Sequence, residues 1–234
     1  MSYIITPSKE QIFPQDWYPK EGYYFRNFID NLPDSGFDKE AKEVLVKESL
    51  NILGNCPNPK NHEEEFQSTG TVIGYVQSGK TTSFMSVVSA ALDNGYNLII
   101  VLGGRNTPLY QQNAKEFREG FNFAIQENKA LVFSVDMLGS SSPKEDIRNL
   151  PLSYLEDDSN LIPQRPIISV ILKHQDHIGQ LTKVIRENHT VHNKIKALVI
   201  DDEADSASLN ALVHDCDETA IYHQIRLLRK SLPR

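Results

Sequence analysis

Residues 74–81, with the sequence GYVQSGKT, constrain the fold of this chain more than any other segment. They match the pattern G-x-x-x-x-G-K-[ST] and stand between an apolar run and a segment with helical periodicity. Glycines allow successive backbone N–H groups to turn inward around phosphate oxygens, and the positive end of the following helix adds to the attraction. A glycine-rich turn without a ligand is the alternative, but the flanking strand and helix favour a phosphate-binding loop.

Downstream of residue 71, short apolar runs alternate with segments of helical periodicity. This alternation is typical of an α/β fold, in which helices flank a mainly parallel sheet. The predicted strands are residues 72–76, 97–102, 130–135, 167–172 and 197–200. One predicted helix ends at Gly95, and the next extends from Thr107 as N-cap to Gly120. Two further helices are predicted from the apolar positions of residues 178–185 and 221–228. Residues 139–164 have a weaker pattern, with a helix start at Ser142 followed by loop residues.

Residues 1–66 differ in composition from the rest of the chain, with six of the twelve prolines and several aromatic clusters. Two helices are predicted here, at residues 21–32 before Pro33 and from Asp38 as N-cap to Gly54. Residues 57–67, with two prolines and three consecutive glutamates, are typical of a linker. We therefore expect a helical N-terminal extension and linker over residues 1–66, followed by an α/β domain over residues 67–234.

The chain has 24 basic and 31 acidic residues, a net charge of −7, which argues against a module that binds nucleic acid by charge alone. Cys56 and Cys216 stand far apart in the sequence, so neither a zinc knuckle nor a disulfide framework is predicted. No apolar run approaches the roughly 18 residues of a membrane span. The first residues also lack the basic and apolar segments of a signal peptide. These features predict a cytoplasmic protein with no membrane partner.

A second strong signal is an apolar run that ends in acidic residues, ALVIDDEAD at residues 197–205. Carboxylates at the carboxyl end of a parallel strand lie at the edge of the sheet where ligands bind. In this position Asp202 can hold Mg²⁺, and Glu203 can orient and polarise an attacking water. Acids after a strand also cap helices, but their combination with the phosphate-binding loop favours the catalytic interpretation. Lys80 would then reach the terminal phosphates, and the hydroxyl of Thr81 would bind Mg²⁺.

Residues 202–205 spell DEAD, and with the phosphate-binding loop they resemble motifs I and II in the first RecA-like domain of superfamily two helicases. The segments GYVQSGKTTS, GYNLIIVLGGRNTPLYQQN and LVIDDEADSASLN together resemble the Z-one domain family, whose members are assigned as endonucleases with helicase-like ATPase cores. The resemblance extends from Thr69 to Asn210. It implies a RecA-like P-loop NTPase domain that binds and hydrolyses ATP with Mg²⁺ and acts on DNA. The nuclease activity does not follow from these residues.

The same resemblance implies roles for individual residues at the nucleotide. Lys80, Asp202 and Glu203 would serve catalysis, and Thr81 and Asp202 would bind Mg²⁺. Asp205 would contact the motif that follows. The phosphate site would consist of Gly74, Gln77, Ser78, Gly79, Lys80, Thr81 and Thr82.

Nucleic-acid contacts are implied in the same way. In helicases the segment after the second strand touches the nucleic-acid backbone, although a capped surface helix is the alternative for this chain. The candidate DNA contacts in that segment are Arg105, Asn106, Gln111 and Gln112. Lys173, at the end of the fourth predicted strand, is either a further DNA contact or a solvated residue.

Helicase-like ATPases need a second RecA-like domain, which supplies arginines that stabilise the transferring phosphoryl group. The resemblance implies that this domain lies C-terminal to Arg234, so we expect the chain to be an N-terminal fragment or a truncated relative. On its own the chain is expected to bind Mg²⁺ and ATP, to hydrolyse ATP very slowly and to bind DNA weakly. A protein partner at the N-terminal extension is a further expectation.

Two other functions are consistent with part of the pattern. A GTPase switch would need a guanine reader of the N-K-x-D type, but neither Asn128-Lys129 nor Asn193-Lys194 continues in that way. A module in which bound nucleotide gates association with a partner protein, without catalysis of its own, remains an alternative. Hydrolysis by the complete protein would separate the ATPase from this module.

Overall fold

The computed structural model describes residues 17–61, 67–72, 80–134, 147–156, 164–204 and 219–233. The chain divides into two compact units, one ending at Tyr96 and the other spanning Asn97–Pro233. The two units divide after Tyr96, whereas the sequence predicts a domain boundary after residue 66. That predicted boundary stays a prediction. No helix among the described residues is both long and apolar enough to cross a membrane.

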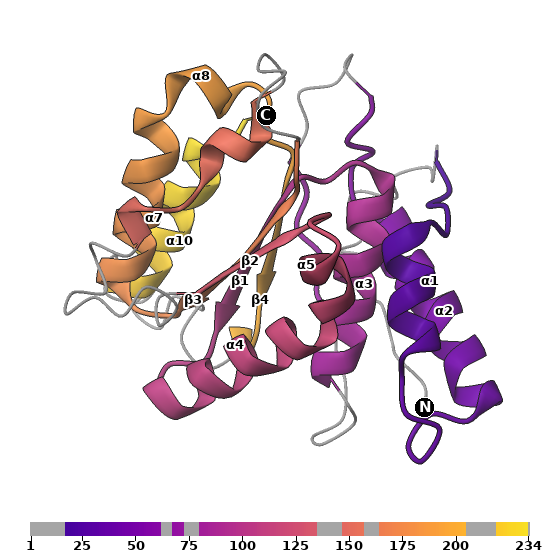
Figure 1. The fold of residues 1–234 in the computed structure, drawn as a ribbon. Coiled ribbons are helices and arrows are strands. Elements are labelled where there is room, and N and C mark those ends of the chain that lie inside the picture. Colours follow the sequence, from indigo (N-terminus) through magenta and orange to yellow (C-terminus); the bar gives the residue numbers. More distant parts are fainter. Residues whose placement is uncertain are drawn as a thin grey trace, which may run out of the picture. The chain divides into compact units, whose positions relative to one another are not determined.

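The described residues of the first unit form three helices, α1 (Tyr23–Asp30), α2 (Lys39–Gly54) and α3 (Lys80–Asn94). Both N-terminal helices pack on α3 (Figure 1). Their buried faces include Phe25, Phe28 and Leu53. These bounds confirm the helices predicted at 21–32 and up to Gly54, and they confirm the predicted helix that ends at Gly95.

The ends of α2 and α3 are formed by the residues that the sequence singles out. The Asp38 side chain accepts a hydrogen bond from the Ala41 N–H and so caps the start of α2. Gly95 follows α3 with φ +107°, a left-handed conformation that favours glycine at the end of a helix. Ser49 of α2 and Ser86 of α3 join the two helices by a buried hydrogen bond between their hydroxyls.

The start of α1 is capped by a residue distant in the sequence. Its own N-cap, Gly22, has no side chain to accept a hydrogen bond. Asp93, near the end of α3, accepts instead from the N–H groups of Gly22, Tyr24 and Phe25 at 2.9–3.0 Å. A Cβ at Gly22 would lie 2.5 Å from Asp93 Cγ, so glycine leaves room for the carboxylate. This cap attaches α1 to α3.

The second unit is built on a four-stranded, all-parallel sheet among the described residues. Its strands are β1 (Leu98–Gly103), β2 (Leu131–Ser134), β3 (Ile167–Leu172) and β4 (Ala197–Asp201), in the order β2-β3-β1-β4. They confirm four of the five predicted strands; the fifth, at 72–76, falls almost entirely outside the described residues. The central strands β1 and β3 are buried along nearly their whole length, which explains their unbroken apolar runs.

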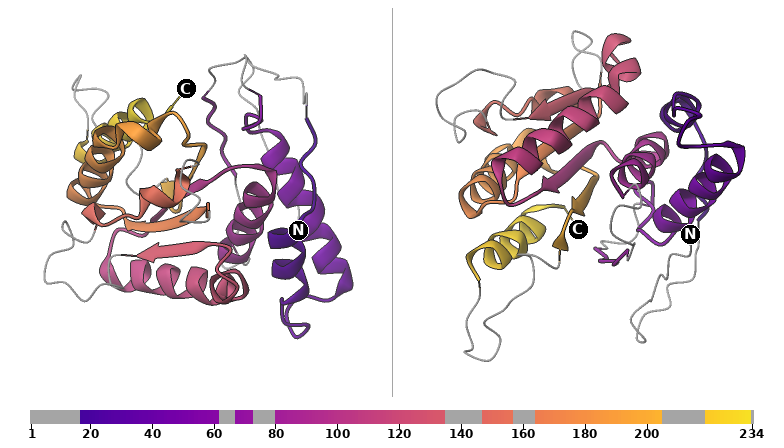
Figure 2. Two further views of the ribbon diagram at one scale, coloured as in Figure 1. Left: turned by 45° about the horizontal axis from the view of Figure 1, so that its top comes forward. Right: turned by 90° about the horizontal axis from the view of Figure 1, so that it is seen from below.

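Helices cover both faces of this sheet. The helices in the described part of this unit are α4 (Thr107–Gly120), α5 (Asn122–Gln126), α7 (Gln175–Glu187), α8 (His189–His192) and α10 (Ala220–Ser231), with a 3₁₀ turn at Leu152–Leu155. α4 packs across β1, β2 and β3, whereas α7 packs on β3 and carries α10 beside it. The chain crosses the sheet in opposite directions through α4 and α7, so right-handed crossovers put these helices on opposite faces (Figure 2).

The start of α4 differs by one residue from the prediction. The N-cap is Asn106, whose side chain accepts a hydrogen bond from the Leu109 N–H at 3.0 Å, and Thr107 is already helical. Asparagine and threonine both cap helices, so residue type alone does not choose between them. The helix start predicted at Ser142 lies outside the described residues.

Candidate functional site

Three strands of the second unit end at the same edge of the sheet, and the residues that follow them form the candidate site. The Lys173 N–H donates to the Gly104 carbonyl at 3.1 Å, and the Asp202 N–H donates to the Leu102 carbonyl at 3.1 Å. These bonds continue the parallel pairing beyond the strands. The carboxyl ends of β1, β3 and β4 therefore present their next residues side by side, at the edge where parallel sheets bind ligands.

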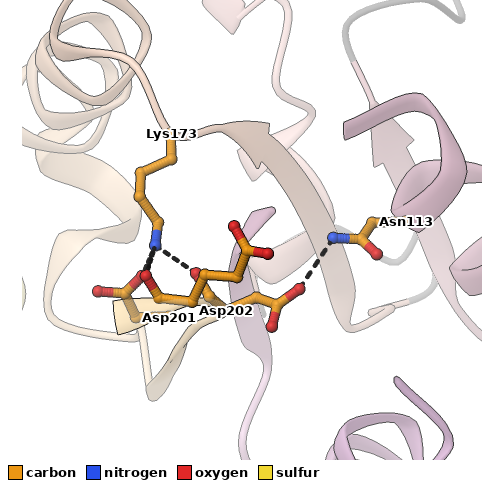
Figure 3. A network of polar contacts seen from close by, with 5 residues as sticks. Asn113, Lys173, Asp201 and Asp202 are labelled. Carbon is orange, nitrogen blue, oxygen red and sulfur yellow. Dashed lines mark hydrogen bonds and ion pairs between the residues drawn. The ribbon is translucent and has the colours of Figure 1, made fainter. Parts of the chain in front are cut away.

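Lys173 is the most buried charged residue that the structure describes at this edge, with 1% of its surface exposed. Its ammonium lies 2.6 Å from Asp201 Oδ1, an ion pair without hydrogen-bond geometry. The same ammonium donates hydrogen bonds to the main-chain carbonyls of Asp202 and Glu203 (Figure 3). These contacts contradict the prediction that Lys173 is either a DNA contact or a solvated residue, because the buried charge faces the protein.

We call residues 201–203 the acidic turn. Asp202 is partly buried, and its Oδ2 accepts a hydrogen bond from Asn113 Nδ2 at 3.2 Å (Figure 3). Glu203 is exposed and has φ +53°, in the left-handed region that residues with a Cβ rarely adopt. The two carboxylates predicted to bind metal and to orient water thus come from one tight turn at the end of β4.

Asn113 is a residue of this site that the sequence analysis did not identify. It lies on the buried face of α4 with Tyr110, Ala114 and Phe117, and only 4% of its surface is exposed. A buried amide needs hydrogen-bond partners, and here the Asp202 carboxylate is one. The signal in the sequence is a polar residue at a helical position whose i−3, i+1 and i+4 neighbours are apolar.

Two glycines allow α4 to approach the sheet edge closely. A Cβ at Gly103 would lie 3.0 Å from Asn113 Nδ2, tighter than an ordinary contact. Gly104 has φ +53°, and a Cβ there would lie 2.8 Å from Leu109 Cγ. The Gly-Gly pair at the end of β1 therefore sets the path by which Asn113 reaches the acidic turn.

The four candidate DNA contacts after the second predicted strand lie at the start of α4 or directly before it, and all four residues are exposed. Two of them make contacts within the helix: Asn106 caps it, and Gln112 Nε2 donates to Glu116 Oε1 at 2.8 Å. Arg105 precedes the cap, and Gln111 is in the second turn. Their exposure is compatible with both interpretations, a DNA contact and a capped surface helix.

The predicted phosphate-binding loop is described only at its downstream end. Gly74, Gln77, Ser78 and Gly79 lie outside the described residues, as does Asp205. Lys80 is the first residue of α3, and Thr81 and Thr82 follow in its first turn, where they are half-buried. No acidic residue occupies that turn, so the helix start has no carboxylate that would repel a phosphate.

Comparisons with protein-family models, curated proteins and solved structures give no match to this chain. The assignment of function therefore depends on the residues and their arrangement. Within the described residues, no three His, Cys, Asp or Glu side chains come together as a ready-made metal site. Asp202 offers carboxylate oxygen, the donor that Mg²⁺ prefers, and Mg²⁺ commonly uses one or two carboxylates with the remaining positions filled by water and phosphate. The donor set thus suits Mg²⁺ accompanied by a nucleotide.

Proposed function

We propose that the chain is the ATP-binding motor domain of a helicase-like, DNA-dependent ATPase of the Z-one type, with a RecA-like P-loop NTPase fold. The observation that carries this proposal is the acidic turn at the end of β4, in the same chain as GYVQSGKT followed by α3. Ligands of parallel α/β sheets bind beyond the carboxyl ends of the strands. The all-parallel order β2-β3-β1-β4 supports this class of fold.

In the proposed site each residue has one task. Lys80 and the N–H groups of the loop would bind the phosphates of ATP, and Thr81 and Asp202 would hold Mg²⁺. Bound Mg²⁺ would neutralise charge on the phosphates and polarise them. Glu203 orients the attacking water, a task that suits an exposed carboxylate on a fixed turn. Asn113 holds one oxygen of Asp202, so the carboxylate is partly oriented before metal binds.

Hydrolysis and DNA binding would need more than this site. A second RecA-like domain would supply arginine to the transferring phosphoryl group, a contribution of about 10³- to 10⁵-fold in related reactions. The exposed start of α4 is the DNA-contact candidate on this chain. With a net charge of −7, DNA affinity should be weak and should fall steeply with salt. Tight DNA binding at physiological salt, measured by fluorescence anisotropy, would contradict this.

A nucleotide-gated protein-interaction module is the second candidate. The Asp93 cap favours it, because it attaches the N-terminal helix α1 to the helix that follows the phosphate-binding loop. In such a module, nucleotide binding would alter how the N-terminal helices receive a partner, and no hydrolysis would be needed. Turnover by the complete protein decides between the two candidates.

Nucleotide titration tests the proposal directly. Lys80→Ala should weaken ATP binding at least tenfold, about 1.4 kcal/mol. Lys39→Ala is the matched control, because Lys39 is an exposed lysine at the first position of α2. Glu203→Gln should leave ATP binding nearly intact and abolish turnover in the complete protein. Equal ATP affinity of the Lys80 variant and the wild type, or normal hydrolysis by Glu203→Gln, would overturn the corresponding role.

A further inference from the structure

We propose that Lys173 is a positioning residue that holds the acidic turn in the conformation in which Asp202 and Glu203 can act. The proposal deepens the proposed function and rests on it, since it concerns the same carboxylates. It replaces the DNA contact that the sequence suggested for Lys173. Three observations support it: the partners of the ammonium, the place of the lysine in the sheet, and the backbone of Glu203.

The ammonium of Lys173 has three oxygen partners: it donates hydrogen bonds to two main-chain carbonyls and forms an ion pair with one carboxylate oxygen. These are Asp201 Oδ1 at 2.6 Å, the Asp202 carbonyl, and the Glu203 carbonyl at 3.0 Å. All three belong to consecutive residues of the acidic turn. The two hydrogen bonds and the ion pair restrain the positions of these oxygens, because without the ammonium the two carbonyls and the Asp201 carboxylate would lose a buried partner.

The strand order explains why a lysine can perform this task. Lys173 follows β3, whereas the acidic turn ends β4, and β1 lies between these two strands. Adjacent strands are about 4.8 Å apart, so β3 and β4 are separated by roughly twice that distance. The side chain of Lys173 must therefore cross the end of β1 to reach the acidic turn. A long, unbranched side chain suits that span, and the side chain of Lys173 is completely buried.

The backbone of Glu203 needs such support. Its φ of +53° lies in the left-handed region, which is unfavourable for a residue with a side chain. The hydrogen bond from Lys173 to the Glu203 carbonyl favours this conformation over the extended alternatives, because they would move the carbonyl away. The direction of the Glu203 side chain, and hence its use in orienting water, follows from that backbone conformation.

Stability alone does not account for this arrangement. Replacing a buried ion pair by uncharged residues of similar size is often neutral or stabilising, whereas removing one partner is strongly destabilising. The double variant Lys173→Met/Asp201→Asn removes both charges together and keeps similar volumes. It therefore separates the positioning of the turn from the stability of the sheet, which Lys173→Met alone would not.

The experiment uses the 234-residue chain as wild type, as Lys173→Met, as the double variant and as Lys183→Met, an exposed lysine of α7 that serves as control. Amide hydrogen exchange is followed in peptides covering β1, β3 and residues 197–204. ATP binding is titrated with and without Mg²⁺. Thermal unfolding reports stability, and Lys173→Met is expected to be the least stable of the four chains.

The double variant should unfold close to the wild type, with β1 and β3 still protected. Exchange in residues 197–204 should be at least tenfold faster, and the Mg²⁺-dependent gain in ATP affinity should fall at least tenfold while Mg²⁺-free binding is unchanged. The proposal would be overturned if the double variant kept the wild-type exchange rate at the turn together with the wild-type Mg²⁺ dependence of ATP binding. Faster exchange throughout the sheet would also overturn it, because that result indicates a purely structural role for Lys173. If the wild type binds no ATP, the proposed function fails and hydrogen exchange alone decides the role of Lys173.

Discussion

Replacing Asp93 by alanine should detach the start of α1 from α3 within the first unit. The carboxylate is the N-terminal cap of α1, since Gly22 has no side chain and three N–H groups donate to Asp93 instead. Alanine would leave these donors without their acceptor. Phe25, which carries one of them, is 1% exposed and has little access to water as a substitute partner.

The magnitude follows from two opposing effects on the carboxylate. Hydrogen bonds to a charged acceptor contribute about 1.5–3 kcal/mol each, against about 1 kcal/mol for an average pair. Burial raises the pKa of Asp93 even though the three backbone N–H bonds lower it, so desolvation offsets part of their benefit. The average of about 1 kcal/mol for each bond is therefore the better guide. For three bonds, Asp93→Ala should lower the free energy of unfolding by about 3 kcal/mol. Asp93→Asn keeps one acceptor oxygen and should cost about half as much.

The measurement is urea unfolding followed by the fluorescence of Trp17, the single tryptophan, which lies in the first unit and donates to the Cys56 carbonyl. Free energies come from linear extrapolation to zero denaturant. Asp30→Ala is the control, because Asp30 is an exposed acid at the other end of α1, where a negative charge does not favour the helix. An Asp93→Ala variant as stable as Asp30→Ala would refute the capping argument.

Other substitutions test the backbone of the site and the chemistry of the first unit. Gly104→Ala should destabilise the second unit by about 2–4 kcal/mol, from the left-handed conformation and the overlap with Leu109. Gly36→Ala is the control, because a Cβ at Gly36 would have no atom within 4 Å, and it should leave the free energy of unfolding in urea nearly unchanged. Equal losses of stability in the two variants would contradict the strain expected at Gly104. Burial raises the pKa of Cys56 to about 11, so in a Cys216→Ser background its alkylation at pH 8 should be on the order of 100-fold slower than that of a free thiol. Because the folded protein raises the pKa of Cys56, the protonated thiol contributes fully to stability below the pKa of an exposed thiol. This contribution should be lost as the pH rises towards 11, and unfolding measured at increasing pH will show the loss.

The elements that the sequence predicted well are those specified by neighbouring residues. The strand predicted at 167–172 has those bounds in the structure, and the Asp38 cap and the Gly95 stop are both observed. Apolar runs, helical periodicity and caps act over a few residues, so they can be detected without knowledge of the fold. The cap of α4 shows the limit of this local information, because Asn106 and Thr107 are both suitable and only the path of the chain after Gly104 selects one.

The candidate site divides in the same way. The sequence alone identified Asp202 and Glu203 as acids after a strand, because the pattern that marks them is contiguous. It assigned Lys173 to DNA or solvent and did not identify Asn113, because their partners lie 29 and 89 residues away.

Local sequence patterns thus determined which segments of this chain become helices and strands, and where its conspicuous acids stand. Tertiary structure decided which polar groups meet. The order β2-β3-β1-β4 brings the ends of β3 and β4 within reach of one lysine, and the packing of α4 across the sheet brings an amide to Asp202. The physical reason is that burial of a charge depends on all the strands and helices around it, whereas the tendency to form each strand or helix depends mainly on its own residues.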